Sequence, residues 1–292
     1  MSPLKLGIPK GSLEMATIDL FAQAGWTITP SSRNYFPGID DPEIICSLVR
    51  PQEMARYVAD GTLDMGLTGW DWILEWECED KVAQIGALEY SKNSNRPCRW
   101  VLVTRHDSPI HCLEDLNGKR IATELEQFTR RYLIQRGITA EVIFSWGATE
   151  AKVVEGLVDA VVEITETGST IKAHGLRIVE ELLETRTMII ANHGAVADPW
   201  KKTKIDQIAL LLNAALTARH KAILKMNVPT AKSDAILALL PSLQAPTINP
   251  LTDSDWLAFE TVVDRSIVRD LIPQLKNAGA VGILEYDLKK VV

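Results

Sequence analysis

A polar turn at residues 163–170 is the stretch of this sequence whose residues could most clearly do chemistry. Residues 159–164 are short, apolar and β-branched, which predicts a buried strand, and Glu163 interrupts the run just before the turn. A short helical run follows and ends at Gly175. Backbone N–H groups at a helix N-terminus bind anions, and Gly168 would let the backbone approach one closely. The turn therefore predicts a site for a phosphate monoester.

The side chains of this turn suit a phosphorylated sugar. Its hydroxyl donors are Thr165, Thr167, Ser169 and Thr170. Glu163 could accept hydrogen bonds from a sugar diol or hold a Mg²⁺ ion, so the turn suggests a ribose 5-phosphate. The same residues also fit an ordinary capped helix after a strand, with Thr170 as the N-cap.

Three further turns of small residues follow predicted strands. Lys10 and Gly11 come after a strand at Leu4–Pro9 and before a helix for which Ser12 is the expected N-cap. The alternative there is a capped helix with a solvated lysine. The other two turns are at residues 68–69 and 147–150. Because all of them lie at strand carboxyl ends, they can converge on one site.

The order of elements predicts two α/β lobes with a third, smaller module. Strands alternate with helices in residues 4–88, which is typical of a parallel sheet with covering helices, and residues 99–164 repeat the pattern. The polar run 89–97 and the strands at 176–183 and 186–192 are expected to cross between the lobes. The expected domains are 1–95 plus 183–216, then 96–182 with the phosphate turn, then 217–292.

The last module has a recognisable strand order. A long helix at 205–223 is expected to connect it to the rest. The predicted order after that helix is β-α-β-β-α-β, which is the ferredoxin-like pattern. Such a module often serves regulation or assembly, by analogy of fold alone.

Composition narrows the class of protein. The chain has 292 residues, of which 46% are hydrophobic, so it can bury a full core in two or three domains. Its net charge of −7 argues against a nucleic-acid surface. The cysteines at positions 46, 78, 98 and 112 form no C-x-x-C pair and have no metal-ligand spacing. With no signal peptide and no apolar run near ~18 residues, we expect a cytoplasmic protein that does not enter a membrane.

Taken in order, the motifs resemble the long form of ATP phosphoribosyltransferase, a family with 5-phosphoribosyl-1-pyrophosphate (PRPP) as a substrate. The matching segments of the first two lobes are PKG at 9–11, VRPQ at 49–52, DMGLTG at 64–69 with Asp71-Trp72, KRIATE at 119–124, RRYL at 130–133, SWGATEA at 145–151, and the turn at 163–170. Residues 239–241, 245–247 and 279–284 look like the regulatory domain of the long form.

The resemblance implies a fold, a reaction and a means of control. The fold is a two-lobed, periplasmic-binding-protein-like core with a C-terminal ferredoxin-like regulatory domain. The reaction joins PRPP to N1 of ATP, with Mg²⁺ accompanying pyrophosphate. Histidine is the implied inhibitor at the C-terminal domain, and the implied assembly is a homo-oligomer, a hexamer built from dimers.

The resemblance also assigns candidate residues. For PRPP they are Glu163, Thr165, Glu166, Thr167, Gly168, Ser169 and Thr170. For ATP and pyrophosphate they are Lys10, Gly11, Arg50, Asp64, Thr68, Gly69, Asp71, Arg99 and Glu150, although Arg50 and Arg99 could equally form structural ion pairs. Thr247 and Ala280 are candidate effector contacts, and Glu163 is a candidate metal ligand. No catalytic acid or base is expected, because adenine N1 carries a free lone pair at neutral pH.

The sequence departs from the family at two places. Glu163 stands where much of the family has Asp, and Leu125-Glu126 stands where many relatives have Tyr-Pro. Two other readings of the residues stay open. Two α/β lobes around a cleft also describe solute-binding proteins and the ligand domains of transcription regulators. The phosphate turn alone would also allow phosphoribosyl transfer to a different base.

Overall fold

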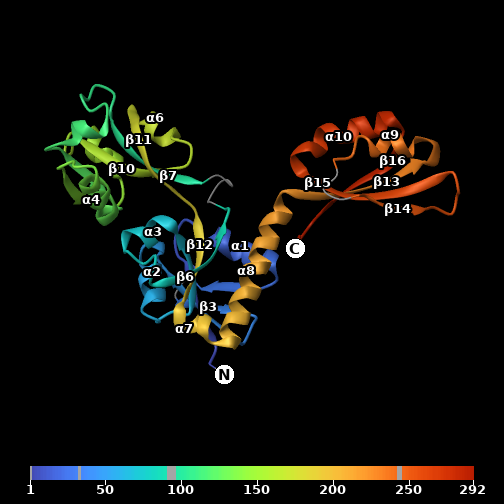
Figure 1. Ribbon diagram of the computed structural model, residues 1–292, viewed down its shortest axis with the longest axis horizontal. Helices are drawn as coiled ribbons and strands as arrows, with labels where there is room; N and C mark the ends of the chain where they lie inside the picture. Colours follow the sequence, from blue (N-terminus) through green and yellow to red (C-terminus); the bar gives the residue numbers. More distant parts are fainter. Residues whose placement is uncertain (1, 32–33, 91–96, 242–244) are drawn as a thin grey trace. The chain divides into compact units, whose positions relative to one another are not determined.

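The computed structural model describes residues 2–31, 34–90, 97–241 and 245–292 (Figure 1). The chain divides into two compact units, one made of Met1–Asp19 and Trp26–Ala209, the other of Leu20–Gly25 and Leu210–Val292. The expected crossing at 89–97 lies largely outside the described residues. Among the residues described, none of the helices combines the length and hydropathy needed to span a bilayer.

The first lobe is built on a five-stranded sheet of order β4-β1-β5-β12-β6. The parallel pairing predicted for this lobe is confirmed for β1 (Leu4–Pro9) with β4 (Ile44–Val49) and β5 (Met65–Gly69). It fails at β6 (Val82–Leu88), because β12 (Thr187–Asn192) returns late in the chain and inserts antiparallel between β5 and β6.

Short helices follow the strands of the first lobe. They are α1 (Glu14–Ala24), α2 (Pro51–Ala59), α3 (Trp70–Glu75) and α7 (His193–Ala197). The expected cap Ser12 is wrong, since α1 begins two residues later and Ser12 lies in the turn before it. A hairpin of β2 (Ile28–Ser31) and β3 (Asn34–Ile39) was not expected, because each strand contains a proline, which is unfavourable inside a sheet.

The second lobe is built on a sheet of order β11-β7-β10-β8-β9. Strand β7 (Cys98–Arg105) is antiparallel to β11 (Leu176–Thr185) and β10 (Ala160–Thr165). Strands β10, β8 (Arg120–Thr123) and β9 (Glu141–Phe144) are mutually parallel, so their carboxyl ends meet at one edge. Only Arg186 separates β11 from β12, which makes this junction a tight crossing between the lobes.

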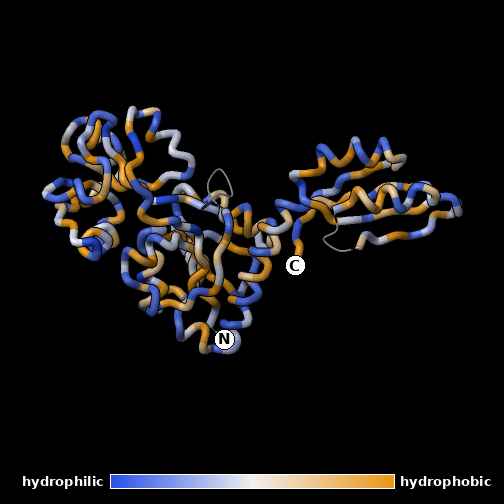
Figure 2. Tube along the Cα trace, turned by 45° about the horizontal axis from the view of Figure 1, so that its top comes forward, coloured by the Kyte–Doolittle hydropathy of each residue, from blue (hydrophilic) through white to orange (hydrophobic). Residues whose placement is uncertain are grey.

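The helices of the second lobe begin at the ends of these strands. They are the 3₁₀ turn η1 (Leu113–Leu116), α4 (Glu126–Gln135), α5 (Thr149–Val154) and α6 (Ser169–Ala173). The expected cap Thr170 is wrong, because α6 starts at Ser169 and Gly168 occupies the N-cap position at φ +73°. Figure 2 shows apolar and polar residues mixed along the trace, and Trp100, Leu102, Ile121 and Val162 form part of the core of this lobe.

The second unit confirms the predicted ferredoxin-like order. Its elements are β13 (Lys221–Pro229), η2 (Thr230–Lys232), α9 (Ser233–Leu237), β14 (Thr247–Pro250), β15 (Trp256–Asp264), α10 (Arg265–Ala278) and β16 (Val281–Asp287). The four strands form an antiparallel sheet of order β14-β15-β13-β16. Apolar residues of α9 and α10 pack with Leu224, Met226 and Phe259 to form its core (Figure 1).

The expected connector helix is wrong at both ends. Helix α8 runs from Pro199 to Arg219, and the chain turns at His220 into β13. Residues 221–223 therefore belong to a strand, whose alternating burial at Ala222, Leu224 and Met226 shows one face in the core. Thr230 also differs from expectation, because its hydroxyl bonds to the Ser254 carbonyl at 3.3 Å and α9 begins only at Ser233.

Candidate active site

A pocket of about 470 Å³ lies in the first unit, where residues of both lobes approach one another. It falls within the size range of small-molecule sites. Four of the predicted site residues line it: Gly69, Asp71, Thr165 and Glu166. The others lie around it or elsewhere, and their contacts separate binding candidates from structural residues.

Asp71 is a buried carboxylate that connects the lobes. It lies in the first turn of α3, where its oxygens accept hydrogen bonds from Trp100 Nε1 of β7 at 2.7 Å and from Thr185 Oγ1 of β11 at 2.9 Å. Burial raises its pKa, and these hydrogen bonds oppose that effect. A Cβ atom at Gly69 would lie 1.9 Å from Asp71 Oδ1, so only glycine leaves space for this carboxylate. Asp71 and Gly69 thus shape the pocket wall.

The predicted phosphate turn is held in shape by its own hydroxyl groups. Thr165 Oγ1 accepts a hydrogen bond from the Gly168 N–H at 2.8 Å, and Thr167 Oγ1 donates to Ser169 Oγ at 3.0 Å. Thr167, Ser169 and Thr170 are exposed. The turn therefore presents exposed hydroxyl groups on a backbone that is already folded.

Glu163 lies beneath this turn on β10, beside two more carboxylates. Its pKa is raised to about 7, first by burial and then by the neighbouring charges of Glu150 and Glu124. Hydrogen bonds from the Ile164 N–H and the Thr149 hydroxyl oppose the rise. A positive charge or several hydroxyl donors would relieve this crowding. In the described part of the chain, no three side chains of the ligating types are grouped closely enough to hold a metal unaided.

Three predicted residues are placed at the edges of this region and do not line the pocket. The Lys10 ammonium lies 3.7 Å from the centroid of the Tyr35 ring, and Gly11 donates its N–H to Glu14 at 3.3 Å. The guanidinium of Arg50 lies 5.1 Å from the ring centroid of Trp146, a residue of the other lobe. Both cations rest on exposed aromatic rings, from which a phosphate could draw them.

Asp64, Thr68 and Arg99 have structural contacts. Asp64 lies at the amino end of β5, where it pairs with Lys201 at 2.7 Å and accepts the Lys5 N–H at 2.8 Å. Since Gly69 ends the same strand, Asp64 is at the opposite edge of the sheet from the pocket. Thr68 is buried and donates to the Pro51 carbonyl at 2.7 Å. Arg99 pairs with Glu181 at 2.9 Å, which is the structural alternative stated for it above.

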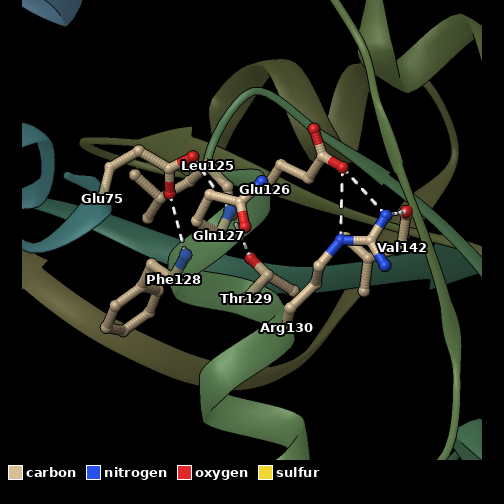
Figure 3. A network of polar contacts seen from close by, with 8 residues as sticks. All are labelled: Glu75, Leu125, Glu126, Gln127, Phe128, Thr129, Arg130 and Val142. Atoms are coloured by element: carbon tan, nitrogen blue, oxygen red, sulfur yellow. Dashed lines mark hydrogen bonds and ion pairs between the residues drawn. The ribbon is translucent and has the colours of Figure 1, made fainter. Parts of the chain in front are cut away.

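Sequence reasoning missed Glu75, a buried carboxylate at the end of α3. Figure 3 shows it accepting hydrogen bonds from the backbone N–H groups of Gln127 and Phe128, at 2.9 and 2.8 Å. These N–H groups open α4, whose own N-cap position holds Leu125 and offers no capping side chain. An apolar residue at a helix start is the signal that could have pointed to a cap from elsewhere.

The same view explains the departure at Leu125-Glu126. Leu125 is fully buried in the core of the second lobe, and Glu126 opens α4 and pairs with Arg130 at 2.8 Å (Figure 3). Arg130 also donates to the Val142 carbonyl. These two residues therefore stabilise the lobe through packing and an i,i+4 ion pair.

The two candidate effector residues are not brought together within one chain. Thr247 begins β14 at one edge of the second unit's sheet and is exposed. Ala280 precedes β16 at the other edge and is buried, with its N–H bonded to the Leu275 carbonyl at 3.0 Å.

Comparison with known proteins supplies what geometry alone leaves open. The family profile described as "HisG: ATP phosphoribosyltransferase" matches residues 50–214, and "HisG, C-terminal domain" matches residues 218–290. ATP phosphoribosyltransferases of Solidesulfovibrio magneticus and Desulfatibacillum aliphaticivorans are 60% and 58% identical to the chain over 289 residues, covering 99% of it and 98% of each relative.

Solved structures agree with these matches. The ATP phosphoribosyl transferase (HisG:HisZ) complex from Thermotoga maritima has a chain that is 28% identical, with a TM-score of 0.61, over 72% of this chain and 98% of that one. XAC2383 from Xanthomonas citri, bound to chloride ion, is 14% identical with a TM-score of 0.51, over 95% of this chain and 98% of that one, and it shows a shared fold only.

Proposed function

The chain belongs to the ATP phosphoribosyltransferase family, the enzymes of the first step of histidine biosynthesis, and we propose that it transfers the 5-phosphoribosyl group of PRPP to N1 of ATP, releasing pyrophosphate. The single observation that supports this reaction at this site is the turn 165–170, folded around Gly168 directly after Glu163. A phosphate on the turn would place the ribose diol of PRPP near Glu163.

Alignment and charge stabilisation would carry most of the rate. Adenine N1 attacks the ribose C1 with its own lone pair, the bond from C1 to the pyrophosphate oxygen breaks, and that oxygen takes the electron pair. No residue needs to remove a proton, so the work of the protein is to hold the two substrates in line. In this proposal Lys10 and Arg50 would leave the rings of Tyr35 and Trp146 and neutralise phosphate charge.

Magnesium fits this site as an ion shared between protein and substrate. Mg²⁺ is usually held by one or two carboxylates together with substrate phosphates. Glu163 and its neighbour Glu150 offer such oxygens, and their crowding favours a nearby cation. When bound, the ion would stabilise the charge that develops on pyrophosphate.

Histidine inhibition and assembly belong to the same proposal. The second unit is a separate antiparallel module, and none of its described residues lines the pocket, which suits an effector domain. Thr247 and Ala280 lie at opposite sheet edges, so an effector site using both would require more than one copy of the module. That requirement supports a homo-oligomer, either a dimer or a hexamer built from dimers, whose assembly responds to histidine.

The test is near-ultraviolet absorbance of the N1-alkylated adenine product, followed with ATP, PRPP and Mg²⁺, with and without histidine. We expect a rise that needs both substrates and that histidine suppresses. Gly168→Val should abolish it, because the added Cβ would lie 3.5 Å from Ile178 Cδ1 and the rest of the side chain would displace the turn that is to receive the phosphate. Gly175→Val is the matched control, because Gly175 has a similar φ of +67° with open space around it. Product formation by Gly168→Val at the wild-type rate would overturn the assignment of the turn. A rise in absorbance with a different base in place of ATP would show that the acceptor is not ATP. The assignment of the turn to the 5-phosphate would still stand.

A further inference from the structure

A relay of hydrogen-bonded side chains leads from Lys152 through Ser145 and Thr149 to Glu163. Lys152 Nζ donates to Ser145 Oγ at 2.7 Å, and Ser145 Oγ lies 3.0 Å from Thr149 Oγ1. Thr149 in turn hydrogen-bonds to the Glu163 carboxyl group. Ser145 and Thr149 are each 1% exposed, so solvent does not compete for these bonds.

A turn of the backbone between β9 and α5 brings the members of this relay together. Strand β9 ends at Phe144, and Gly147 and Ala148 both adopt positive φ angles, +65° and +48°. Left-handed geometry is rare for alanine and is kept where the surrounding structure requires it. The turn brings Thr149, the first residue of α5, back to Ser145 at the end of β9. It thereby places a buried hydroxyl against the carboxylate on β10.

The two end members of the relay, Lys152 and Glu163, fix the direction of every hydrogen bond in it. An ammonium group can only donate, and above its pKa of about 7 the Glu163 carboxylate can only accept. Ser145 therefore accepts from Lys152 and donates to Thr149, and Thr149 donates to Glu163. Without Lys152, the hydroxyl of Ser145 could turn either way, and the proton of Thr149 would no longer be directed at the carboxylate.

We propose that Lys152 is a positioning residue for PRPP: through Ser145 and Thr149 it holds the Glu163 carboxylate in the orientation that accepts the ribose diol. This role rests on the proposed function, because the contact between Glu163 and the ribose diol is part of that function. In this role Lys152 acts through Ser145 and does not itself bind PRPP. Its removal should weaken PRPP binding and leave ATP binding almost unchanged.

The experiment compares four variants by steady-state kinetics and by calorimetric titration of PRPP. Lys152→Met keeps the apolar stem and removes the donor, and Lys152→Arg keeps a cationic donor. Thr149→Val removes the hydroxyl with little change of shape, and Thr149→Ser keeps it. We expect Lys152→Met and Thr149→Val each to raise the KM and Kd for PRPP about tenfold, as loss of a supporting hydrogen bond does at other sites, with the KM for ATP changed less than about twofold. Lys152→Arg and Thr149→Ser should restore most of the PRPP affinity.

The double variant Lys152→Met with Thr149→Val separates a relay from general loss of structure. If the residues act in one relay, the double variant binds PRPP about as weakly as either single variant, because one substitution already interrupts the relay. Lys119→Met, a change just before the amino end of β8 and so at the opposite end of the parallel strands from Glu163, should match the wild type.

The outcomes distinguish this inference from the function beneath it. Wild-type protein that forms no product refutes the proposed function. An active wild type with an unchanged PRPP affinity in Lys152→Met, or with effects that multiply in the double variant, refutes the relay. If Lys152→Met fails to fold, the pair Thr149→Val and Thr149→Ser decides, and equal PRPP affinity in these two refutes it as well.

Discussion

Replacing Glu163 by Gln should stabilise the substrate-free protein, and the gain should depend on pH. Gln keeps the shape and still accepts the hydrogen bonds from the Ile164 N–H and the Thr149 hydroxyl. It removes a charge that is partly buried beside Glu150 and Glu124. The ionised carboxylate lowers the stability of the folded protein at this position. A residue that costs stability is the pattern expected of a residue kept for binding.

The magnitude follows from the pKa. The pKa of Glu163 rises from 4.5 to about 7 in the folded protein. Between these values the folded state binds more protons at this group than the unfolded state, so wild-type stability falls as pH rises through this window. At about 1.4 kcal/mol per pKa unit, the full cost above pH ~7 is about 3 kcal/mol. We therefore expect Glu163→Gln to exceed the wild type by about 3 kcal/mol at pH ~8 and by about 1 kcal/mol at pH ~5.

Urea unfolding at these two pH values, followed by tryptophan fluorescence, measures the difference. All tryptophans except Trp256 lie in the first unit, so the signal reports mainly the unit that contains Glu163. Glu141→Gln, an exposed substitution at the amino end of β9, is the control and should change the free energy of unfolding by less than about 0.5 kcal/mol. A gain that is absent at pH 8, or equal at both pH values, would refute the reasoning. The same variant should bind PRPP more weakly, because a neutral amide replaces the charged acceptor of the diol.

Three further predictions follow from individual contacts. Glu75→Ala should lower the free energy of unfolding by about 1–2 kcal/mol in urea titrations, because two N–H groups at the start of α4 lose their acceptor; an unchanged midpoint would remove Glu75 as the cap. Gly69→Ala should displace the Asp71 carboxylate, since the added Cβ would lie 1.9 Å from Oδ1, and should lower both the melting temperature and kcat/KM, whereas a wild-type melting curve would contradict that packing. Chelating Mg²⁺ with EDTA should stop product formation while moving the substrate-free melting temperature by less than about 2 °C, because no protein-only cage of ligands is found among the described residues; a large fall in melting temperature would instead indicate a structural metal.

Local patterns in the sequence predicted the parts of the site that are themselves local. The strand, turn and helix around Gly168 are continuous in the chain, so apolar runs and small residues were enough to find them. The antiparallel insertion of β12 depends on which strand is a neighbour in space, and nothing within residues 187–192 records that. Asp64 illustrates the same limit for side chains. A carboxylate beside a small-residue strand can bind a ligand or pair with a lysine, and Lys201 lies 137 positions away.

Two buried carboxylates, Asp71 and Glu75, share one helix, and their contacts explain how the pocket can hold two substrates in line. Helix α3 has six residues, yet Asp71 at its start bonds to Trp100 and Thr185, and Glu75 at its end caps α4. The Leu74 carbonyl accepts a further hydrogen bond from Arg131. A reaction without acid or base catalysis depends on how accurately two substrates are held, so the lobes that hold them must be fixed to one another. Buried carboxylates serve this purpose well, because each loses several hydrogen bonds at once if the lobes separate. Asp71 lines the pocket and Glu75 closes the same helix, so the hydrogen bonds of α3 to the second lobe lie beside the place where we propose that the substrates meet.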